Sequence, residues 1–144
     1  IFAATDLLAD TKLAPELSNE AHYYRAKAYL DAGKTDGAME DLKILAKDTR
    51  NVYGAEAKYK VAQIYFDGGQ TDKAEQEVLN YIEVSTPHTY WLARSFVLLA
   101  DVYMKSGRNL DAKQYLLSLK QNYQADDDIA GMIESRLEKL KTEN

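Results

Sequence analysis

The 144-residue sequence contains no cysteine, two prolines and two histidines. Without cysteine, neither disulfides nor thiolate metal sites can form. With so few prolines and only seven glycines, long irregular segments are not expected. No apolar run approaches the roughly 18 residues of a membrane-spanning helix, so direct membrane insertion is not expected.

Positive charge is also in deficit. Eighteen Lys and Arg residues face 23 Asp and Glu residues, which gives a net charge of -5. Nucleic acids and anionic membranes select basic surfaces, so neither is expected as the main ligand. Apolar residues make up 46% and charged residues 28%, as in globular proteins that bury a core. Tyrosine is frequent, with 11 residues, and suits both half-exposed helix seams and contact surfaces.

Three segments of the sequence align without gaps around a glycine. Gly33, Gly69 and Gly107 are separated by 36 and 38 residues (69 − 33 and 107 − 69). Alanine occurs seven positions before and five positions after each glycine, and tyrosine four positions before it. These residues are Ala26, Tyr29 and Ala38, then Ala62, Tyr65 and Ala74, then Ala100, Tyr103 and Ala112. A pattern with this period predicts a stack of similar units.

Each recurring residue has a role in a hairpin of two helices, A and B. The alanines let the helices approach closely, and the tyrosine fills the wider gap one turn away. The glycine is expected to end helix A in the left-handed conformation. Two residues later, Thr35, Thr71 and Asn109 are expected to be the N-caps of helix B. Helix B then carries an apolar stripe of Ala38, Leu42 and Leu45, of Ala74, Val78 and Tyr81, or of Ala112, Leu116 and Leu119.

This spacing of small residue, tyrosine, glycine and alanine resembles the tetratricopeptide repeat over about residues 19–124. The resemblance implies one all-α domain, a right-handed superhelical stack of antiparallel helix hairpins. Its expected parts are a partial repeat with helix B alone at 1–14, repeats at 19–54, 55–92 and 93–124, and a capping helix or half repeat at 126–142. The expected helices are 2–12, 19–32, 35–47, 54–67, 71–84, 89–105, 109–122 and 127–141.

The repeat period exceeds the usual ~34 residues, and the segment 51–57 precedes the second helix A. In these respects the sequence is similar to bacterial cell-envelope repeat proteins, such as outer-membrane-assembly lipoproteins and periplasmic partners of the Tol–Pal system. That resemblance implies a periplasmic or envelope-associated location, with the cytoplasm as the alternative.

The two ends of the sequence differ from a complete repeat. Residues 1–13 follow the spacing of helix B with no helix A before them, and the chain begins with isoleucine rather than methionine. We therefore expect the chain to be the C-terminal segment of a larger repeat protein. Its uncovered first helix predicts self-association through that helix, because each repeat buries its apolar face only against a neighbour.

No enzymatic activity, cofactor or metal site is predicted. The sequence has no glycine-rich phosphate loop and no Gly-x-Ser-x-Gly elbow. His22 and His88 lie about two repeats apart, too far to share a metal ion. A surface or capping role is expected for His88, which follows Pro87 at a helix start. The three aspartates at 126–128 fit a helix cap better than a cation loop, whose ligands are spread over a dozen residues.

The resemblance implies that a protein or peptide partner binds the concave face, which helix A lines in the tetratricopeptide family. The side chains expected there are Tyr23, Lys27 and Leu30, then Tyr59, Gln63 and Phe66, then Arg94, Asp101 and Met104. Aromatic and methionine side chains with single charges suit an extended or helical peptide with apolar anchors. Aromatic residues at this spacing also suit packing between hairpins. The carboxylate clamp of chaperone-binding members is incomplete here.

Two functions are consistent with these observations. One is a non-catalytic interaction scaffold in a cell-envelope assembly, whose contacts lie partly at its ends. The other is a stand-alone adaptor that holds a peptide in its concave groove. A contiguous apolar patch in the groove would favour the adaptor.

The register of the repeat predicts two destabilising substitutions in the middle hairpin. Ala62→Leu should push helices A and B apart and cost about 1–3 kcal/mol by overpacking. Gly69→Val should cost at least about 1 kcal/mol, because valine disfavours the left-handed conformation. Thermal denaturation of both variants measures these costs, and an unchanged melting temperature in both would show that the register is wrong.

Overall fold

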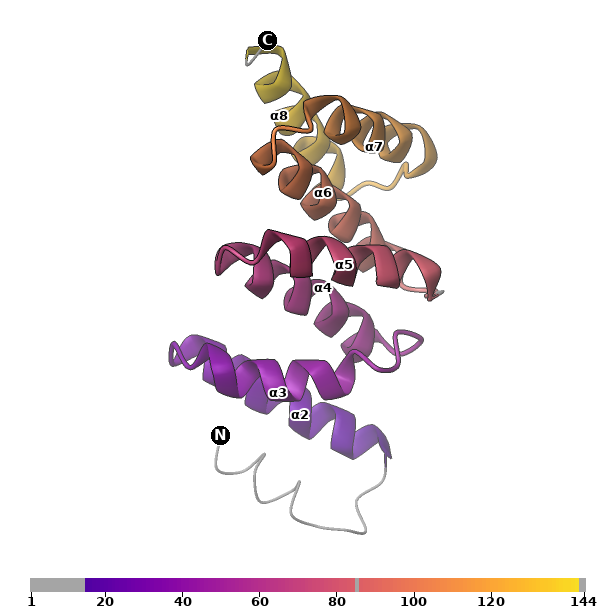
Figure 1. The fold of residues 1–144 in the computed structure, drawn as a ribbon. Coiled ribbons are helices and arrows are strands. Elements are labelled where there is room, and N and C mark those ends of the chain that lie inside the picture. Colours follow the sequence, from indigo (N-terminus) through magenta and orange to yellow (C-terminus); the bar gives the residue numbers. More distant parts are fainter. Residues whose placement is uncertain (1–14, 85, 143–144) are drawn as a thin grey trace.

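The computed structural model describes residues 15–84 and 86–142, and all regular secondary structure in these ranges is α-helical. The helices are α2 Pro15–Asp31, α3 Thr35–Leu45, α4 Val52–Asp67, α5 Thr71–Glu83, α6 Thr89–Lys105, α7 Asn109–Asn122 and α8 Ile129–Thr142. They form a superhelical stack of antiparallel hairpins, from α2 at the bottom of Figure 1 to α8 at the top. The predicted all-α stack is confirmed, and the helix expected over 2–12 lies outside the described residues.

The observed helices begin and end within four residues of the expected bounds. The largest difference is at α2, which begins at Pro15 instead of residue 19. Proline is tolerated in the first turn of a helix, where its missing N–H has no intrahelical partner. Helices α4 and α6 begin at Val52 and Thr89, a few residues before the expected starts of the second and third repeats at 55 and 93. Those repeat boundaries stay predictions.

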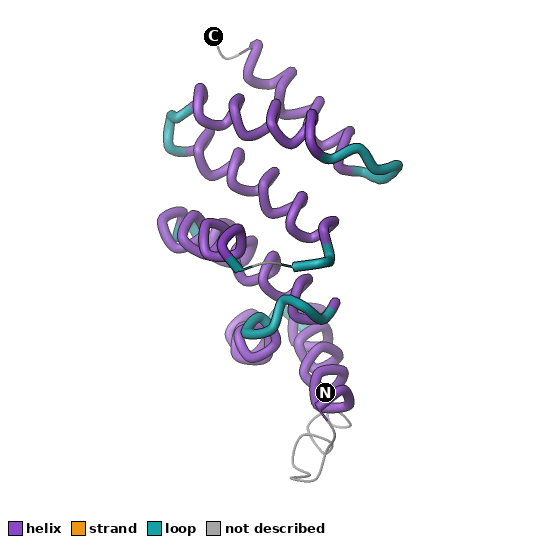
Figure 2. The backbone as a smooth tube through the Cα atoms, turned by 90° about the vertical axis from the view of Figure 1, so that its right-hand side faces the viewer, coloured by secondary structure: helices purple, strands orange, loops and turns teal. Residues whose placement is uncertain are grey.

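Consecutive helices pair as α2 with α3, α4 with α5 and α6 with α7. Figure 1 shows α3 and α5 passing in front of α2 and α4, and Figure 2 shows the same stack from the side. Each later A helix, α4 or α6, packs on both helices of the preceding hairpin, and α8 packs in the same way on α6 and α7. The A helices α2, α4, α6 and α8 therefore form a continuous row, whereas the B helices do not contact one another within the described chain.

A left-handed glycine ends helix A in each of the three hairpins. Gly33, Gly69 and Gly107 have φ angles of 74°, 79° and 78°, which confirms the prediction for these positions. In the first turn the N–H of Gly33 donates to the carbonyl of Leu30 at 3.0 Å, and the N–H of Lys34 donates to that of Tyr29 at 2.7 Å. This pair of bonds is the Schellman motif, and both equivalents recur in the other two turns.

The N-caps of helix B expected at Thr35, Thr71 and Asn109 are wrong by one position. Lys34 is the N-cap of α3, and its carbonyl accepts the N–H of Ala38 at 3.2 Å. The residue after the glycine is likewise the N-cap of α5 and α7, and none of the three caps through its side chain. The cause is the tight turn: one residue completes the Schellman motif with its N–H and begins helix B with its carbonyl.

Small and apolar residues are buried at the predicted positions. The six alanines of the repeat pattern are at most 1% exposed, and the nine residues of the helix B stripes are at most 8% exposed. The buried residues form two clusters that meet at α4. Ala57 and Val61 of α4 belong to the cluster with α2 and α3, whereas Tyr59 and Ala62 belong to the larger cluster with α5 to α8.

A fully buried carboxylate joins the two helices of the first hairpin. Asp41 of α3 is 0% exposed, and its oxygens accept bonds of 2.6 and 2.8 Å from Arg25 and one of 2.8 Å from Nδ1 of His22. Arg25 and His22 both lie on α2. Because a buried carboxylate is costly unless it is paired, these bonds fix α2 and α3 together. Asp41 in turn holds the pKa of Arg25 above its ordinary value.

The positions of His22 and Asp41 recur in the other hairpins with different chemistry. Eleven residues before and eight after the glycine, the second hairpin has Lys58 and Glu77, with Nζ and Oε1 at 2.6 Å. The third hairpin has Phe96 and Tyr115 there, with ring centroids 6.1 Å apart. The same contact between helices A and B is therefore a hydrogen bond in the first hairpin, an ion pair in the second and an aromatic contact in the third.

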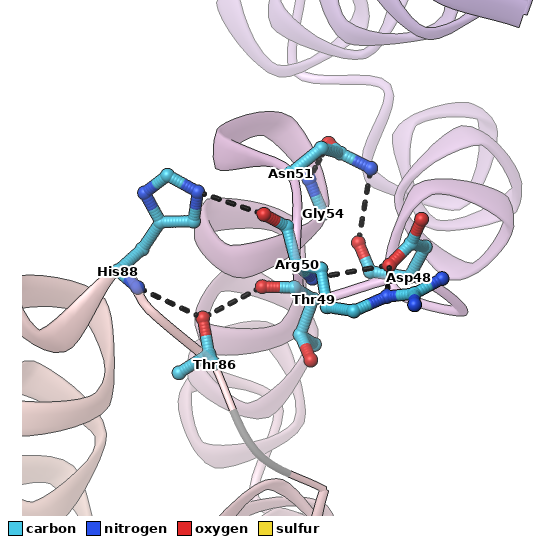
Figure 3. Close-up of polar contacts among 7 residues, drawn as sticks. All are labelled: Asp48, Thr49, Arg50, Asn51, Gly54, Thr86 and His88. Carbon is cyan, nitrogen blue, oxygen red and sulfur yellow. Dashed lines mark hydrogen bonds and ion pairs between the residues drawn. The ribbon is translucent and has the colours of Figure 1, made fainter.

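The junction between the first two hairpins depends on a glycine (Figure 3). The side chain of Asn51 caps α4, since its Oδ1 accepts the N–H of Gly54 at 2.8 Å and its Nδ2 donates to the carbonyl of Asp48 at 3.1 Å. A Cβ on Gly54 would lie 1.8 Å from that same carbonyl oxygen. Position 54 therefore requires glycine because the start of α4 lies directly on the loop that follows α3.

The loop before α6 is bonded to the loop before α4, as Figure 3 shows. The hydroxyl of Thr86 donates to the carbonyl of Thr49 at 2.6 Å, and Nε2 of His88 donates to that of Arg50 at 3.0 Å. The predicted surface or capping role of His88 is confirmed in that its backbone is the N-cap of α6. Its ring, however, connects two loops that are 38 residues apart.

Two glycines at the third position of a helix provide a matched test of this junction. Gly54→Ala should destabilise the protein by about 1–3 kcal/mol or more, because the new methyl group overlaps the backbone carbonyl of Asp48. Gly131→Ala in α8 should be neutral or stabilising by up to about 1 kcal/mol, because nothing lies within 4 Å of the added Cβ. Urea denaturation followed by circular dichroism measures both, and similar effects at the two positions would contradict the close approach at Gly54.

Candidate protein-binding face

The face of the row α2, α4, α6 and α8, here called the A-helix face, carries the predicted binding residues. Side-chain contacts join each helix of the row to the next. Three of them, one at each step, are Tyr23 with Glu56, Tyr59 with Arg94, and Asp101 with Arg136. Each of them contains at least one residue expected at the site from the sequence.

At the first step, Tyr23 of α2 lies within a group of charged and aromatic side chains. Its hydroxyl donates to both carboxylate oxygens of Glu56 at 3.1 Å, and Lys60 holds the same carboxylate at 2.6 Å. The ammonium group of Lys27 lies 5.4 Å from the Tyr23 ring centroid, and the Tyr53 ring 4.8 Å from it. Burial and the nearby charge of Glu56 raise the pKa of Tyr23 to about 12. Lys27 itself is exposed, so it is available to a partner.

At the second step, the predicted site residue Tyr59 is only 7% exposed. Its ring centroid lies 5.7 Å from that of Trp91 and 5.1 Å from the guanidinium carbon of Arg94. Its hydroxyl donates to Gln63 at 2.8 Å, and Gln63 donates onward to Asp67 at 2.8 Å. Burial raises the pKa of Tyr59. A partner would therefore contact mainly Gln63 and Arg94. The buried Tyr59 holds both side chains in position through its hydroxyl and its ring.

At the third step, Asp101 of α6 forms a bidentate salt bridge with Arg136 of α8. Its two carboxylate oxygens accept bonds of 3.0 Å each from Nε and Nη2 of Arg136. Beside this pair, α4, α6 and α8 enclose an open cavity of about 550 Å³. Its lining residues are Phe66, Asp101, Met104, Lys105, Ser135, Arg136 and Lys139. Three predicted site residues, Phe66, Asp101 and Met104, thus come together at one place.

Leu30 does not join that cavity. It lines another one, of about 570 Å³, together with Met39, Ile64 and Tyr65 near the helix A–B turns of the first two hairpins. The nine predicted residues are therefore distributed along the whole A-helix face, with one dense group at its C-terminal end.

The contribution of α8 to the cavity was not predicted from the sequence. Ser135, Arg136 and Lys139 form one wall of it, whereas the sequence indicated only a capping helix. A signal was present in the spacing of opposite charges: Asp101 and Arg136 are 35 residues apart, close to the repeat period. A charge pair at this spacing places the second partner on the next A helix.

Of the aspartates at 126–128, Asp127 and Asp128 form hydrogen bonds within the chain. Oδ1 of Asp127 accepts the N–H of Ile129 at 2.9 Å, which confirms a capping role, and Oδ1 of Asp128 accepts the hydroxyl of Tyr90 at 2.8 Å. No group of three metal-ligating side chains is found in the described ranges. Among the helices described, none combines the length and the apolar character needed to cross a membrane.

Residues 20–48 match one protein-family model, described as tetratricopeptide repeat. The matched segment covers the first hairpin, with most of α2 and all of α3, and ends just after α3. This repeat generally mediates protein–protein interactions and is typically a non-catalytic scaffold. The other two hairpins have the same alanine, tyrosine and glycine positions. No curated protein and no solved structure matches the chain.

The raised pKa of Tyr23 predicts a loss of stability at high pH. The tyrosine pKa is about 10 in an unfolded chain and about 12 in this folded one, so folding favours the neutral hydroxyl. Its contribution to the free energy of unfolding is fully present below about pH 10 and is lost as the pH rises toward 12. Urea denaturation between about pH 8 and pH 11 should show a smaller pH-dependent loss for Tyr23→Phe than for the wild type.

The matched control is Tyr24→Phe, which removes the hydroxyl of the neighbouring, 59% exposed ring. If both variants change the pH dependence of the free energy of unfolding equally, the assignment to Tyr23 is contradicted.

Proposed function

We propose that this protein is a non-catalytic scaffold that binds a protein partner through its A-helix face, with an extended or helical peptide segment lying along the groove. The observation that carries the proposal is the cavity of about 550 Å³ between α4, α6 and α8. Phe66 and Met104 are partly buried there against the core. A partly exposed apolar floor with polar groups around it is the usual form of a peptide-binding groove.

The rest of the A-helix face supports the same function. Half-exposed side chains on it are held in place by aromatic neighbours, as Arg94 of α6 is by Tyr59 of α4 and by Trp91 of its own helix. Side chains that are already ordered lose little conformational entropy when a partner binds. The face is therefore suited to specific recognition along its length.

The bonds of the two histidines support a non-catalytic role. His22 is bonded to the buried Asp41, and His88 to a backbone carbonyl. Both rings hold parts of the fold together, and a general base needs a substrate proton within reach instead.

The finer parts of the proposal concern the assembly. The repeat spacings of 36 and 38 residues, similar to those of bacterial cell-envelope members, support a scaffold in an envelope assembly. The apolar floor of the cavity supports an adaptor that holds a single peptide. Fractionation of the cells that make the protein separates these two, because only the first requires an envelope location.

Site-specific photo-crosslinking in those cells tests the binding face. A photoreactive amino acid at Gln63 or Met104, both on the A-helix face, should give crosslinks to a partner protein. The same group at Gln76 or Gln114, which are exposed on the B helices α5 and α7, should give few or none. Equal crosslinking from both pairs of positions, or crosslinks to nucleic acid alone, would contradict the proposed function.

A further inference from the structure

The cavity between α4, α6 and α8 is positively charged in a negatively charged protein. Its lining contains three cations, Lys105, Arg136 and Lys139, and a single carboxylate, Asp101. The whole chain has a net charge of -5. The local excess of positive charge is therefore a property of this site and does not reflect the composition.

Two of the three cations are available to a ligand. The guanidinium group of Arg136 is compensated by its paired bonds to Asp101. Lys105 and Lys139 form no ion pair with any residue in the described part of the chain, and both are exposed. The ammonium group of Lys105 lies 5.9 Å from the centroid of the Phe66 ring, which keeps this charge beside the apolar floor.

The cavity that contains Leu30 has the opposite sign. Its lining includes two carboxylates, Asp36 and Asp67, and no lysine or arginine. Both cavities have apolar side chains and similar volumes, about 550 and 570 Å³. Electrostatic complementarity therefore directs an acidic segment to the cavity at α8 and away from the one at the first two hairpins.

We propose that the cavity at α8 binds an acidic segment of a partner protein, which inserts one apolar side chain between Phe66 and Met104 and places carboxylates beside Lys105 and Lys139. This inference rests on the proposed function and names the chemistry of the partner. A nucleic acid fits less well, because two free lysines in a chain of charge -5 provide little of the phosphate neutralisation that such ligands need.

Fluorescence anisotropy with the full chain and synthetic peptides tests the proposal. The probe is a fluorescein-labelled peptide of four glutamates, one phenylalanine and four further glutamates. At about 50 mM salt it should bind at least about fivefold more tightly than the same peptide with glutamines. Replacing its phenylalanine by alanine should weaken binding, and a lysine version should bind more weakly than the glutamine version.

Charge reversal locates the site. The double variant Lys105→Glu/Lys139→Glu should lower the affinity for the glutamate peptide roughly tenfold. The matched control Lys34→Glu/Lys113→Glu makes the same change of charge at two exposed lysines outside the cavity and should change the affinity less than about twofold. All four substitutions lie at exposed positions, so circular dichroism should show the wild-type fold in both variants.

If the glutamate peptide binds, three results would still overturn the proposal. One is equal affinity for the glutamate and glutamine peptides, and another is an equal loss of affinity in the two double variants. The third is an oligothymidine that displaces the peptide and binds through Lys105 and Lys139. If no peptide binds but the photo-crosslinker at Met104 still captures a protein, the acidic partner is wrong and the proposed function stands. If that crosslinking also fails, the proposed function itself is wrong.

Discussion

The structure depends on the close approach of two helices at a pair of alanines beside a left-handed glycine. Alanine is nearly fully buried at both positions of every described hairpin, and the glycine has a φ angle near +75° in each. A larger residue at either alanine would separate the helices, and a Cβ at the glycine would strain the turn. Because this geometry repeats, the A helices form a row, and the row provides the surface on which the cavity lies.

The fold could be predicted from the sequence to the extent that it depends on local rules. The period of small residues, the glycines and the helix B stripes each report on a few neighbouring residues, and they located the helices correctly. The displaced N-caps show where such rules compete. Thr35 is a good capping residue by type, but the Schellman turn of Gly33 determines the start of the helix first. The buried Asp41 was also not predicted, because its partners lie 16 and 19 residues away on another helix.

For the candidate site, the helical period identified the face but not the depth of each side chain within it. Tyr59 and Tyr23 occupy equivalent positions, ten residues before the glycine, and differ only in what the next helix places against them. Trp91 of α6 covers Tyr59, whereas Glu56 and Tyr53 of α4 lie against Tyr23. These differences arise between repeats, where a pattern within one repeat carries no information. The wall formed by α8 was missed for the same reason.

The division of the core at α4 has a consequence for how the stack responds to a ligand. The first hairpin buries its side chains in one cluster, the remaining helices bury theirs in another, and α4 contributes to both. Two cooperative units that share one helix can open separately, as neighbouring repeats do. A peptide that spans the A-helix face from α2 to α8 would contact both units and so oppose their separate opening. Binding would then stabilise α2 and α3 against local opening, and their amide hydrogens would exchange more slowly. This effect would appear far from the cavity that holds the apolar side chain of the peptide.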